Sequence, residues 1–379
     1  METRRPTEAL ASYFEILADA DFLDYCPIYD RIARAMAADH DALELLIDHS
    51  HARARMPVLF LAATHDLVLR GADPQLRAIY DGESDADPWP RFRELLFANR
   101  AEISQMMHTR STQTNEVGRS ANLVPIHRAI AARLRAAGDE RPLALVEIGP
   151  SAGLNLFADQ YDITYTHPDG RAERIGDPTS QVHLHCNLLG GRAPDLSIDP
   201  PVIAMRTGLD PAPIDITDEA QCRWLQACVW PGVPDRAERL AAAIAHARLA
   251  PPVLHIGDAA ADLGPLIDSI GEDMIPVVTS TWALAYLPTE RRTHVIETID
   301  AIGARRDLVL ITGEDPALTP WVPAIDQRIL DAHVGDGTPT VFAVRAWSGG
   351  VSMTRPVSLC HPHGGWMVWL LDQQEGSHG

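Results

Sequence analysis

Several features that would narrow the class of protein at once are missing from this sequence. It has no C-x-x-C motif, no Lys/Arg-rich run and no apolar run long enough to span a bilayer. Its opening residues, METRRPTEALASYFEIL, lack the apolar core and small-residue cleavage site of a secretory signal. The cysteines number five, an odd count. We therefore expect reduced thiols in a cytoplasmic protein and no disulfide framework.

Basic residues are scarce relative to acidic ones. The 379 residues include 52 Asp and Glu but only 32 Lys and Arg, which gives a formal net charge of -20. This charge repels a phosphate backbone, so nucleic acid is not the expected partner. The 46% hydrophobic and 22% charged residues are typical of a soluble globular chain. A small-molecule substrate is the default expectation, and no membrane partner is expected. Whether the protein forms a homodimer is left open.

The sequence predicts two domains. Apolar residues recur at helical spacing up to about residue 138, so residues 1–140 are expected to form an all-helical lid or substrate domain. From Leu143, continuous apolar runs such as LALVEIG alternate with helical segments. This favours a Rossmann-like α/β domain with a mostly parallel, doubly wound sheet over residues 141–372. We expect a hairpin insertion at about 161–190 and an antiparallel edge made by the last strands.

Polar residues stand where four of the predicted strands end. Glu147–Gly153 follow the first strand, Asp210 ends the second, Asp258 ends the third, and Ser280 and Thr281 end the fourth. Carboxyl ends of parallel strands meet at one edge of the sheet, where doubly wound folds bind ligands. Glycines in the first loop allow a ligand to approach backbone N–H groups. The same residues also fit a plain structural role, in tight turns and helix caps.

The run VEIGPSAGLNL resembles the first motif of class I S-adenosylmethionine-dependent methyltransferases, with Ser151 where glycine is common. The resemblance covers roughly the C-terminal two-thirds of the chain and implies a methyltransferase-type sheet. It implies that the first loop binds methionine and ribose, that Asp210 binds ribose and that Asp258 binds adenine. The cofactor-binding residues are then Glu147, Gly149, Ser151, Gly153, Asn155, Asp210, Asp258 and Ser280. The hairpin insertion and the lack of an obvious catalytic base after the fourth strand depart from the family pattern.

A second resemblance covers almost the whole chain. The segments CPIYDRIARAMAAD, HDLVLRG, TQTNEVGRSANLVP, EIGPSAGLNL, GLDPAPIDITD, WLQACVWP and HPHGGWMVW are similar to a conserved bacterial family of unknown function. This resemblance supports the architecture and leaves the substrate open.

Two other functions fit parts of the pattern. Gly149-x-Ser151-x-Gly153 matches the nucleophile elbow of serine hydrolases or acyltransferases, with Asp258 or Glu314 as acid and a later histidine as base. Against it, helices rather than strands precede the elbow, and no HGGG-type oxyanion loop is present. A non-catalytic ligand-binding protein on a methyltransferase-like fold is the third hypothesis.

The remaining candidates are a pair of histidines and a polar segment before the first strand. His361 and His363 are the predicted acid/base groups, together with Glu116. The predicted substrate-binding residues are Gln113, Asn115, Arg119, Arg206, Trp282 and Tyr286. The two H-x-H pairs, at 183/185 and 361/363, have a spacing that suits a metal on a strand. Hydrogen-bonded or solvent-facing histidines are the favoured interpretation, so no metal is expected.

Overall fold

A computed structural model describes residues 6–47, 56–332 and 340–371. The chain forms two compact units, Met1–Thr114 with Thr217–Ala241, and Asn115–Ile216 with Ala242–Gly379. This division differs from the expected boundary near residue 140. Residues 217–241 belong with the helical unit, where Trp224 joins the hydrophobic core and its Nε1 donates to Ser111 O at 3.0 Å. Parts of the expected domains, at 1–5, 48–55, 333–339 and 372, lie outside the described residues.

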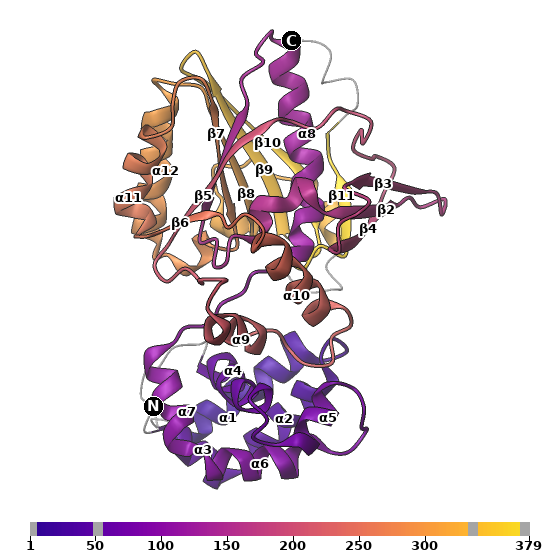
Figure 1. The fold of residues 1–379 in the computed structure, drawn as a ribbon, viewed down its shortest axis with the longest axis vertical. Helices are drawn as coiled ribbons and strands as arrows, with labels where there is room; N and C mark the ends of the chain where they lie inside the picture. Colours follow the sequence, from indigo (N-terminus) through magenta and orange to yellow (C-terminus); the bar gives the residue numbers. More distant parts are fainter. Residues whose placement is uncertain (1–5, 48–55, 333–339, 372–379) are drawn as a thin grey trace. The chain divides into compact units, whose positions relative to one another are not determined.

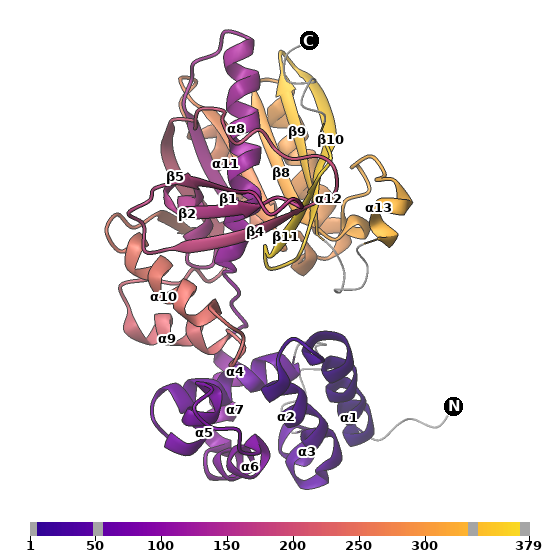
Figure 2. The ribbon, with the colours of Figure 1, turned by 90° about the vertical axis from the view of Figure 1, so that its right-hand side faces the viewer.

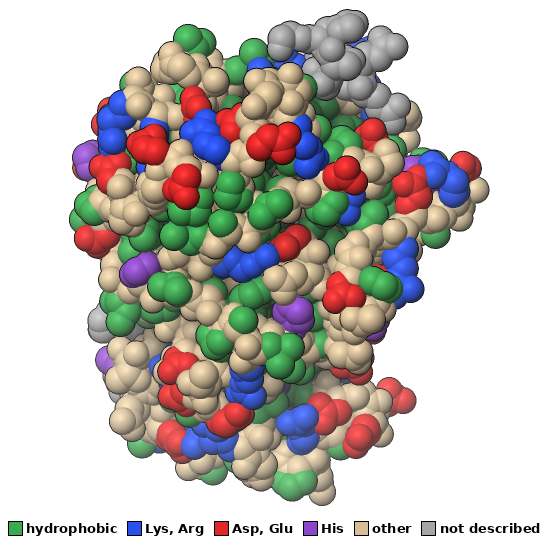
Figure 3. All heavy atoms as spheres, turned by 45° about the horizontal axis from the view of Figure 1, so that its top comes forward, with side chains coloured by type: hydrophobic (Ala, Val, Ile, Leu, Met, Phe, Trp, Pro, Cys, Tyr) green, Lys and Arg blue, Asp and Glu red, His purple; other side chains and the backbone are tan. Residues whose placement is uncertain are grey.

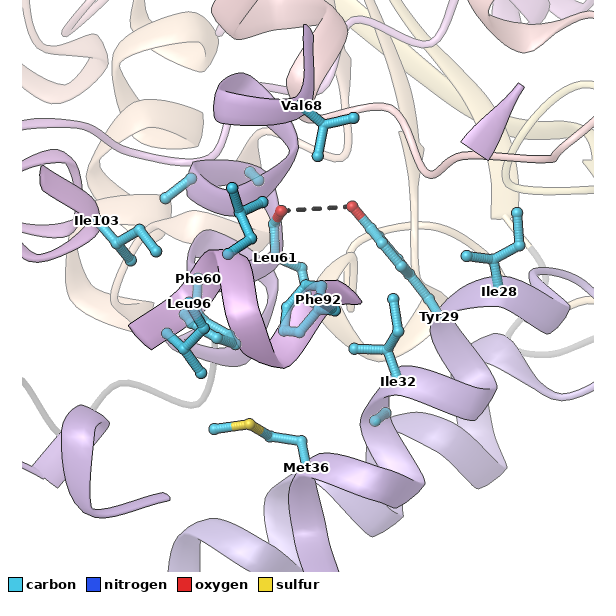
Figure 4. Packing of buried hydrophobic residues seen from close by; sticks show 14 of the residues in the cluster. Ile28, Tyr29, Ile32, Met36, Phe60, Leu61, Val68, Phe92, Leu96 and Ile103 are labelled. Atoms are coloured by element: carbon cyan, nitrogen blue, oxygen red, sulfur yellow. Dashed lines mark hydrogen bonds between the residues drawn. The ribbon is translucent and has the colours of Figure 1, made fainter. Parts of the chain in front are cut away.

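The helical unit is built from short amphipathic helices. On one of them, residues Ile28, Tyr29, Ile32 and Met36 recur at helical spacing and are buried. Figure 4 shows these side chains packed among those of other helices, with Tyr29 Oη donating to Leu61 O at 3.4 Å. The elements are α1 (Pro6–Leu17), a π-helical turn (Ala18–Phe22), α2 (Pro27–Ala38), α3 (His40–Ile47), α4 (Met56–Leu69), α5 (Pro74–Tyr80), α6 (Pro88–Ala98), α7 (Arg100–Thr109) and α9 (Glu219–Ala227). Helix α10 (Arg236–Ala247) crosses the division.

The second unit contains a single mixed sheet, which confirms the predicted α/β fold class. In the described residues its order is β3-β2-β4-β11-β10-β9-β8-β7-β1-β5-β6. The strands are β1 (Leu143–Ile148), β2 (Asp162–Thr166), β3 (Ala172–Gly176), β4 (His183–Leu189), β5 (Ile203–Asp210), β6 (Val253–Ile256), β7 (Ile275–Thr281), β8 (Leu308–Glu314), β9 (Thr340–Ser348), β10 (Val351–Cys360) and β11 (Trp366–Trp369).

Strand β1 lies at the centre of a doubly wound, parallel block. The chain continues from β1 to β5 and β6 on one side and to β7 and β8 on the other, and all four pairings in this block are parallel. The order 3-2-1-4-5 within the block is that of doubly wound folds, which bind ligands at the carboxyl ends of the strands where the order reverses. We call this end of the block the carboxyl edge.

Helices cover the two faces of this sheet differently. Ala144, Val146 and Ile148 of β1 pack against α11 (Ala259–Asp268) and α12 (Thr289–Gly303) in one hydrophobic core. The opposite face carries α8 (Ser120–Ala136), and Figures 1 and 2 both show α8 on the side away from α11 and α12. Because side chains alternate along a strand, Glu147 faces the α8 side.

Three local expectations change. The segment after β1 is a 3₁₀-helix (Leu154–Gln160) rather than an α-helix, and Gly153 precedes it in the left-handed conformation. The predicted hairpin is present as β2 and β3, and β4 adds to it in parallel beside β2. The last three strands do not form an edge. They lie inside the sheet, with antiparallel β9 and β10 following β8, and the edge strands are β3 and β6.

The surface of the described residues carries mixed charge. On the face drawn in Figure 3, arginines are interspersed with acidic side chains and with exposed hydrophobic ones. No helix in the described ranges is both long and apolar enough to cross a membrane.

Candidate functional site

The loop after β1 turns through three left-handed residues at the carboxyl edge. Gly149, Ser151 and Gly153 have φ angles of 65°, 54° and 71°. A Cβ on Gly149 would stand 2.8 Å from Ala283 Cβ, so only glycine fits there. Ser151 adopts this conformation although it carries a side chain, which costs energy and is common at functional sites. The loop is therefore held in an unusual left-handed shape, in which Gly149 N donates to Leu209 O and Gly153 N donates to Pro150 O.

Asp210 fixes this loop through its carboxylate. Its Oδ2 accepts from Ser151 N at 2.9 Å and its Oδ1 accepts from Ala212 N at 2.8 Å. Asp210 therefore lies beside the first loop, as predicted, but both of its oxygens already hold backbone groups. A ribose hydroxyl at this position would share an oxygen with one of these N–H donors, because each carboxylate oxygen has two lone pairs.

Glu147 is the most perturbed acid at the carboxyl edge. Its side chain is 3% exposed, and burial raises the pKa of its carboxyl from 4.5 to about 8. The positive charge of Arg119 and a hydrogen bond from Asn155 oppose this shift, and the charge of Asp210 adds to it. Among the described residues neither Glu147 Oε2 nor Ser151 Oγ has a hydrogen-bond partner. Two buried polar atoms with unmet hydrogen bonds thus flank the loop.

Arg119 links three loops that are far apart in the sequence. Its Nε donates to Pro362 O at 2.9 Å and its Nη1 donates to Thr281 O at 3.2 Å. The residue is buried, and its charge acts on Glu147 and on Glu314. The predicted substrate residue Arg119 therefore lies within the candidate site, at its centre.

The segment before α8 packs directly on the first loop. Asn115 Oδ1 accepts from Leu154 N at 3.0 Å, and Asn155 Oδ1 accepts from Ser120 Oγ at 2.8 Å. These bonds bring the predicted residues Asn115 and Asn155 together. The start of α8 and the 3₁₀-helix after β1 are thereby held as one assembly.

His363 and Glu116 form an acid–base pair next to Arg119. His363 Nδ1 lies 3.4 Å from Glu116 Oε2, while Glu116 Oε1 accepts from Gly118 N at 3.1 Å. His361 Nδ1 accepts from His363 N at 3.1 Å, so one histidine orients the backbone of the other. A Cβ on Gly118 would overlap His363 O, which shows how tightly the two segments pack. All three predicted acid/base residues are thus brought together.

The loop after β7 is held by a buried acid. Glu314 Oε1 accepts from Ser280 Oγ at 2.8 Å and from Ala283 N and Leu284 N at 3.1 Å each. Burial raises the pKa of the Glu314 carboxyl, and these hydrogen bonds oppose the shift. Trp282 has a φ of 57°, a strained value for a bulky residue, and its Nε1 donates to Thr340 Oγ1 at 2.7 Å. Strained residues thus occur in the loops on both sides of the order reversal.

Four predicted site residues are not part of this cluster. Arg206 lies in mid-strand and binds both carboxylate oxygens of Asp159, at 2.7 and 2.8 Å. Asp258 caps α11 through Ala260 N at 2.9 Å and forms an ion pair with Arg291. Tyr286 is 55% exposed, and Gln113 belongs to the helical unit.

The described residues do not assemble a hydrolase triad around Ser151. Of the two candidate acids, Asp258 pairs with Arg291 and Glu314 bonds to Ser280. His363 lies beside Glu116. The residues described also contain no group of three or more His, Cys, Asp or Glu placed to hold a metal ion.

Sequence reasoning missed Ser120, which bonds to Asn155 of the candidate site, and the equally buried polar residues Asn122 and Ser358. The signal was weak but present. Ser120 and Asn122 interrupt the apolar side of α8, and Ser358 interrupts the inward side of β10. Polar residues on buried faces require hydrogen-bond partners, so each was a candidate for a specific role.

Fold and site together define an α/β protein with a left-handed, acid-flanked loop at the reversal of a doubly wound sheet. A family model described as "Uncharacterized protein conserved in bacteria (DUF2332)" matches residues 11–369, and the chain belongs to this family. This confirms the resemblance to a conserved bacterial family of unknown function. A search of the curated proteins gives no match.

Proposed function

We propose that the protein transfers a methyl group from S-adenosylmethionine to a small-molecule acceptor. One observation carries the proposal. The left-handed loop Gly149–Gly153 lies at the order reversal of the doubly wound sheet, beside the unmet polar atoms Glu147 Oε2 and Ser151 Oγ. Doubly wound sheets bind nucleotide cofactors at this position.

The residues in and beside the loop after β1, at the carboxyl edge, suit a positively charged cofactor. Within the described residues Glu147 Oε2 and Ser151 Oγ have no hydrogen-bond partner, so both are available to a ligand. When bound, S-adenosylmethionine supplies an electrophilic methyl group and a positive charge. Asp258, which is half-buried and paired with Arg291, would hold adenine in place of that partner.

Glu147 provides the electrostatic complement. With a pKa of about 8 the carboxyl is mostly protonated at neutral pH in the free protein. A positive charge held nearby favours the ionised form and lowers that pKa. Binding is therefore expected to release a proton from Glu147.

His363 and Glu116 provide the acid–base function. Glu116 holds His363 at its Nδ1 side, 3.4 Å away, which leaves Nε2 as the atom that removes a proton from the acceptor. The chain otherwise acts by holding both reactants in place and excluding water.

Calorimetric titration with S-adenosylmethionine and with its demethylated product tests the proposal. We expect dissociation constants in the micromolar range for the wild type. Glu147→Gln should weaken binding at least tenfold, because it removes the ionisable acid. The matched control is Glu140→Gln, an exposed residue before β1, which should bind as the wild type does. No heat with either ligand at millimolar concentration contradicts the proposal.

A serine hydrolase remains the second candidate, because Ser151 has both a strained φ of 54° and an unpartnered Oγ among the described residues. A fluorophosphonate probe that labels the wild type but not Ser151→Ala would favour it. Cofactor binding without any turnover would favour the non-catalytic hypothesis. We also propose a cytoplasmic location, supported by five cysteines that are all buried and form no disulfide.

A further inference from the structure

Asn122 and Ser358 are completely buried, and their side chains make no hydrogen bond to any residue that the structure describes. Each is 0% exposed. Neither Asn122 Nδ2, Asn122 Oδ1 nor Ser358 Oγ finds a partner within the described ranges. Buried side-chain polar groups are nearly always paired in native proteins. Two such residues in one neighbourhood therefore point to a bound polar group.

Two contacts place Asn122 and Ser358 at the same level of the fold. Near the end of α8, Arg133 Nη1 lies 3.8 Å from Met353 Sδ at the start of β10, and before α8 the Nε of Arg119 donates to Pro362 O beyond the end of β10. Helix and strand therefore run antiparallel. Asn122 lies about three turns, or roughly 16 Å, before Arg133. Ser358 lies roughly 16 Å beyond Met353 along the strand.

The two side chains also lie on facing surfaces. A separation of about three whole turns puts Asn122 on the same side of α8 as Arg133, which reaches β10. On β9, Ala346 pairs with Met353 and Phe342 pairs with Ser358. Positions 342 and 346 share one face of a strand, so Ser358 lies on the face that carries Met353. That face is the one covered by α8.

The surroundings favour a neutral ligand group. Next to Ser358, the ring of Phe342 lies over Gly313, where a Cβ would stand 2.6 Å from Phe342 Cζ. Two cations lie nearby: Arg119 already donates to two carbonyl oxygens, and Arg355, on the same face of β10 as Ser358, has a partner of its own. An ion buried here would lack a dedicated partner, which is costly.

The hydrogen-bonding groups of Asn122 and Ser358 limit further which chemical group of a ligand could bind there. Its amide offers two donors and one acceptor oxygen, and Ser358 offers one hydroxyl that donates and accepts. A carboxamide presents a donor and an acceptor side by side and matches this set. A ketone offers an acceptor but no donor, so it would leave an acceptor oxygen of Asn122 unpaired. A carboxylate offers only acceptors and brings a negative charge.

We propose that Asn122 and Ser358 form a subsite that binds a neutral carboxamide or lactam group of the acceptor. Its role as an acceptor subsite rests on the proposed methyl transfer. The position suits that role, because β10 leads from Ser358 directly into the loop with His361 and His363. In the sheet, β9, β8 and β7 separate β10 from the proposed cofactor loop after β1, so the subsite would hold a part of the acceptor remote from the methylated atom.

The test measures fragment binding by ligand-observed NMR, with no S-adenosylmethionine present. The probes are benzamide, its isostere acetophenone, and benzoate. We expect benzamide to bind with a millimolar dissociation constant and the other two to bind at least tenfold more weakly. Asn122→Leu should abolish benzamide binding, and Ser358→Ala should weaken it severalfold. The matched control is Asn187→Leu on β4, an exposed position, which should bind as the wild type does.

Thermal unfolding of each variant shows whether it is folded, and Ser358→Ala keeps the test valid if Asn122→Leu does not fold. Three results would overturn the subsite: no benzamide binding by the wild type, equal binding of acetophenone, or undiminished binding by both folded variants. The last would mean that water alone satisfies these groups. Benzamide binding without any cofactor binding would instead reject the methyl transfer and keep the subsite.

Discussion

Asp210 holds the backbone of Ser151, with its Oδ2 2.9 Å from Ser151 N. The residue at the end of the second strand thereby sets the shape of the loop after the first. This bond explains how a residue with a side chain keeps a φ of 54° at the carboxyl edge.

Asp210→Ala is predicted to lose both stability and cofactor binding. It leaves the N–H groups of Ser151 and Ala212 without their acceptor, which costs about 1–3 kcal/mol. Urea unfolding measures the stability, and calorimetry with S-adenosylhomocysteine measures the binding. Asp210→Asn should recover part of both, since its side-chain oxygen can still accept. Full binding by a destabilised Asp210→Ala variant would show that the loop does not form the cofactor site.

The raised pKa of Glu147 predicts a specific pH dependence of stability. The unfolded carboxyl ionises near pH 4.5 and the folded one near pH 8. Between these values the folded state binds more protons, so its stability falls as pH rises, by at most about 1.4 kcal/mol per pH unit. In Glu147→Gln the part of this slope that Glu147 contributes should be lost. Urea unfolding of both proteins at pH 5 to 9 tests it, and parallel pH profiles would contradict the assignment.

The same acid predicts proton release on ligand binding. At pH 7 the free carboxyl is mostly protonated, and a bound positive charge ionises it. Titrations in two buffers of different ionisation enthalpy should give different observed heats. The difference should correspond to the release of close to one proton per site. Glu147→Gln should give the same observed heat in both buffers, which corresponds to almost no proton release. A wild-type protein that takes up protons would argue against a cationic ligand beside Glu147.

His363→Asn is predicted to slow turnover without affecting cofactor binding. General bases contribute about 10²–10⁴-fold to rate, and Glu116 orients this one. Turnover is measured as S-adenosylhomocysteine released in a protein-free cell extract that supplies the acceptor. The control is His183→Asn, because His183 lies on β4 and pairs with Asp162 instead. Equal loss of rate in both variants, or loss of cofactor binding in His363→Asn, would exclude the base role.

Arg206→Ala should affect stability alone. The guanidinium binds Asp159 at two oxygens and lies over the Phe157 ring, with 5.3 Å from its Cζ to the ring centroid. Its loss leaves a mostly buried carboxylate unpaired, at a cost of about 3–5 kcal/mol. Thermal unfolding should register the change while the dissociation constant of S-adenosylhomocysteine stays within twofold. A large change in that constant would return Arg206 to the candidate site.

Much of the parallel block could be predicted from the sequence. The strands β1, β7 and β8 begin with apolar runs and are buried along their whole length, and strands buried on both faces favour such runs. The left-handed first loop follows from its glycines. These patterns lie within short segments, so they can be recognised from a single sequence.

The parts that were missed depend on contacts between distant segments. Arg119 meets Pro362 across most of the chain, and no local pattern records that pairing. The position of β9 and β10 inside the sheet depends on β4 joining β11, which depends in turn on an insertion after β1. Residues 217–241 leave the sheet unit because Trp224 fits the helical core. Arg206 looked available only because Asp159 could not be placed beside it.

The most direct test of the proposed function is an experimental structure of the protein crystallised with S-adenosylhomocysteine. We predict ligand density at the loop Gly149–Gly153, with polar atoms of the ligand within hydrogen-bond distance of Glu147 Oε2 and Ser151 Oγ. Density for the ligand elsewhere, or an unchanged loop with no ligand at saturating concentration, would contradict the account.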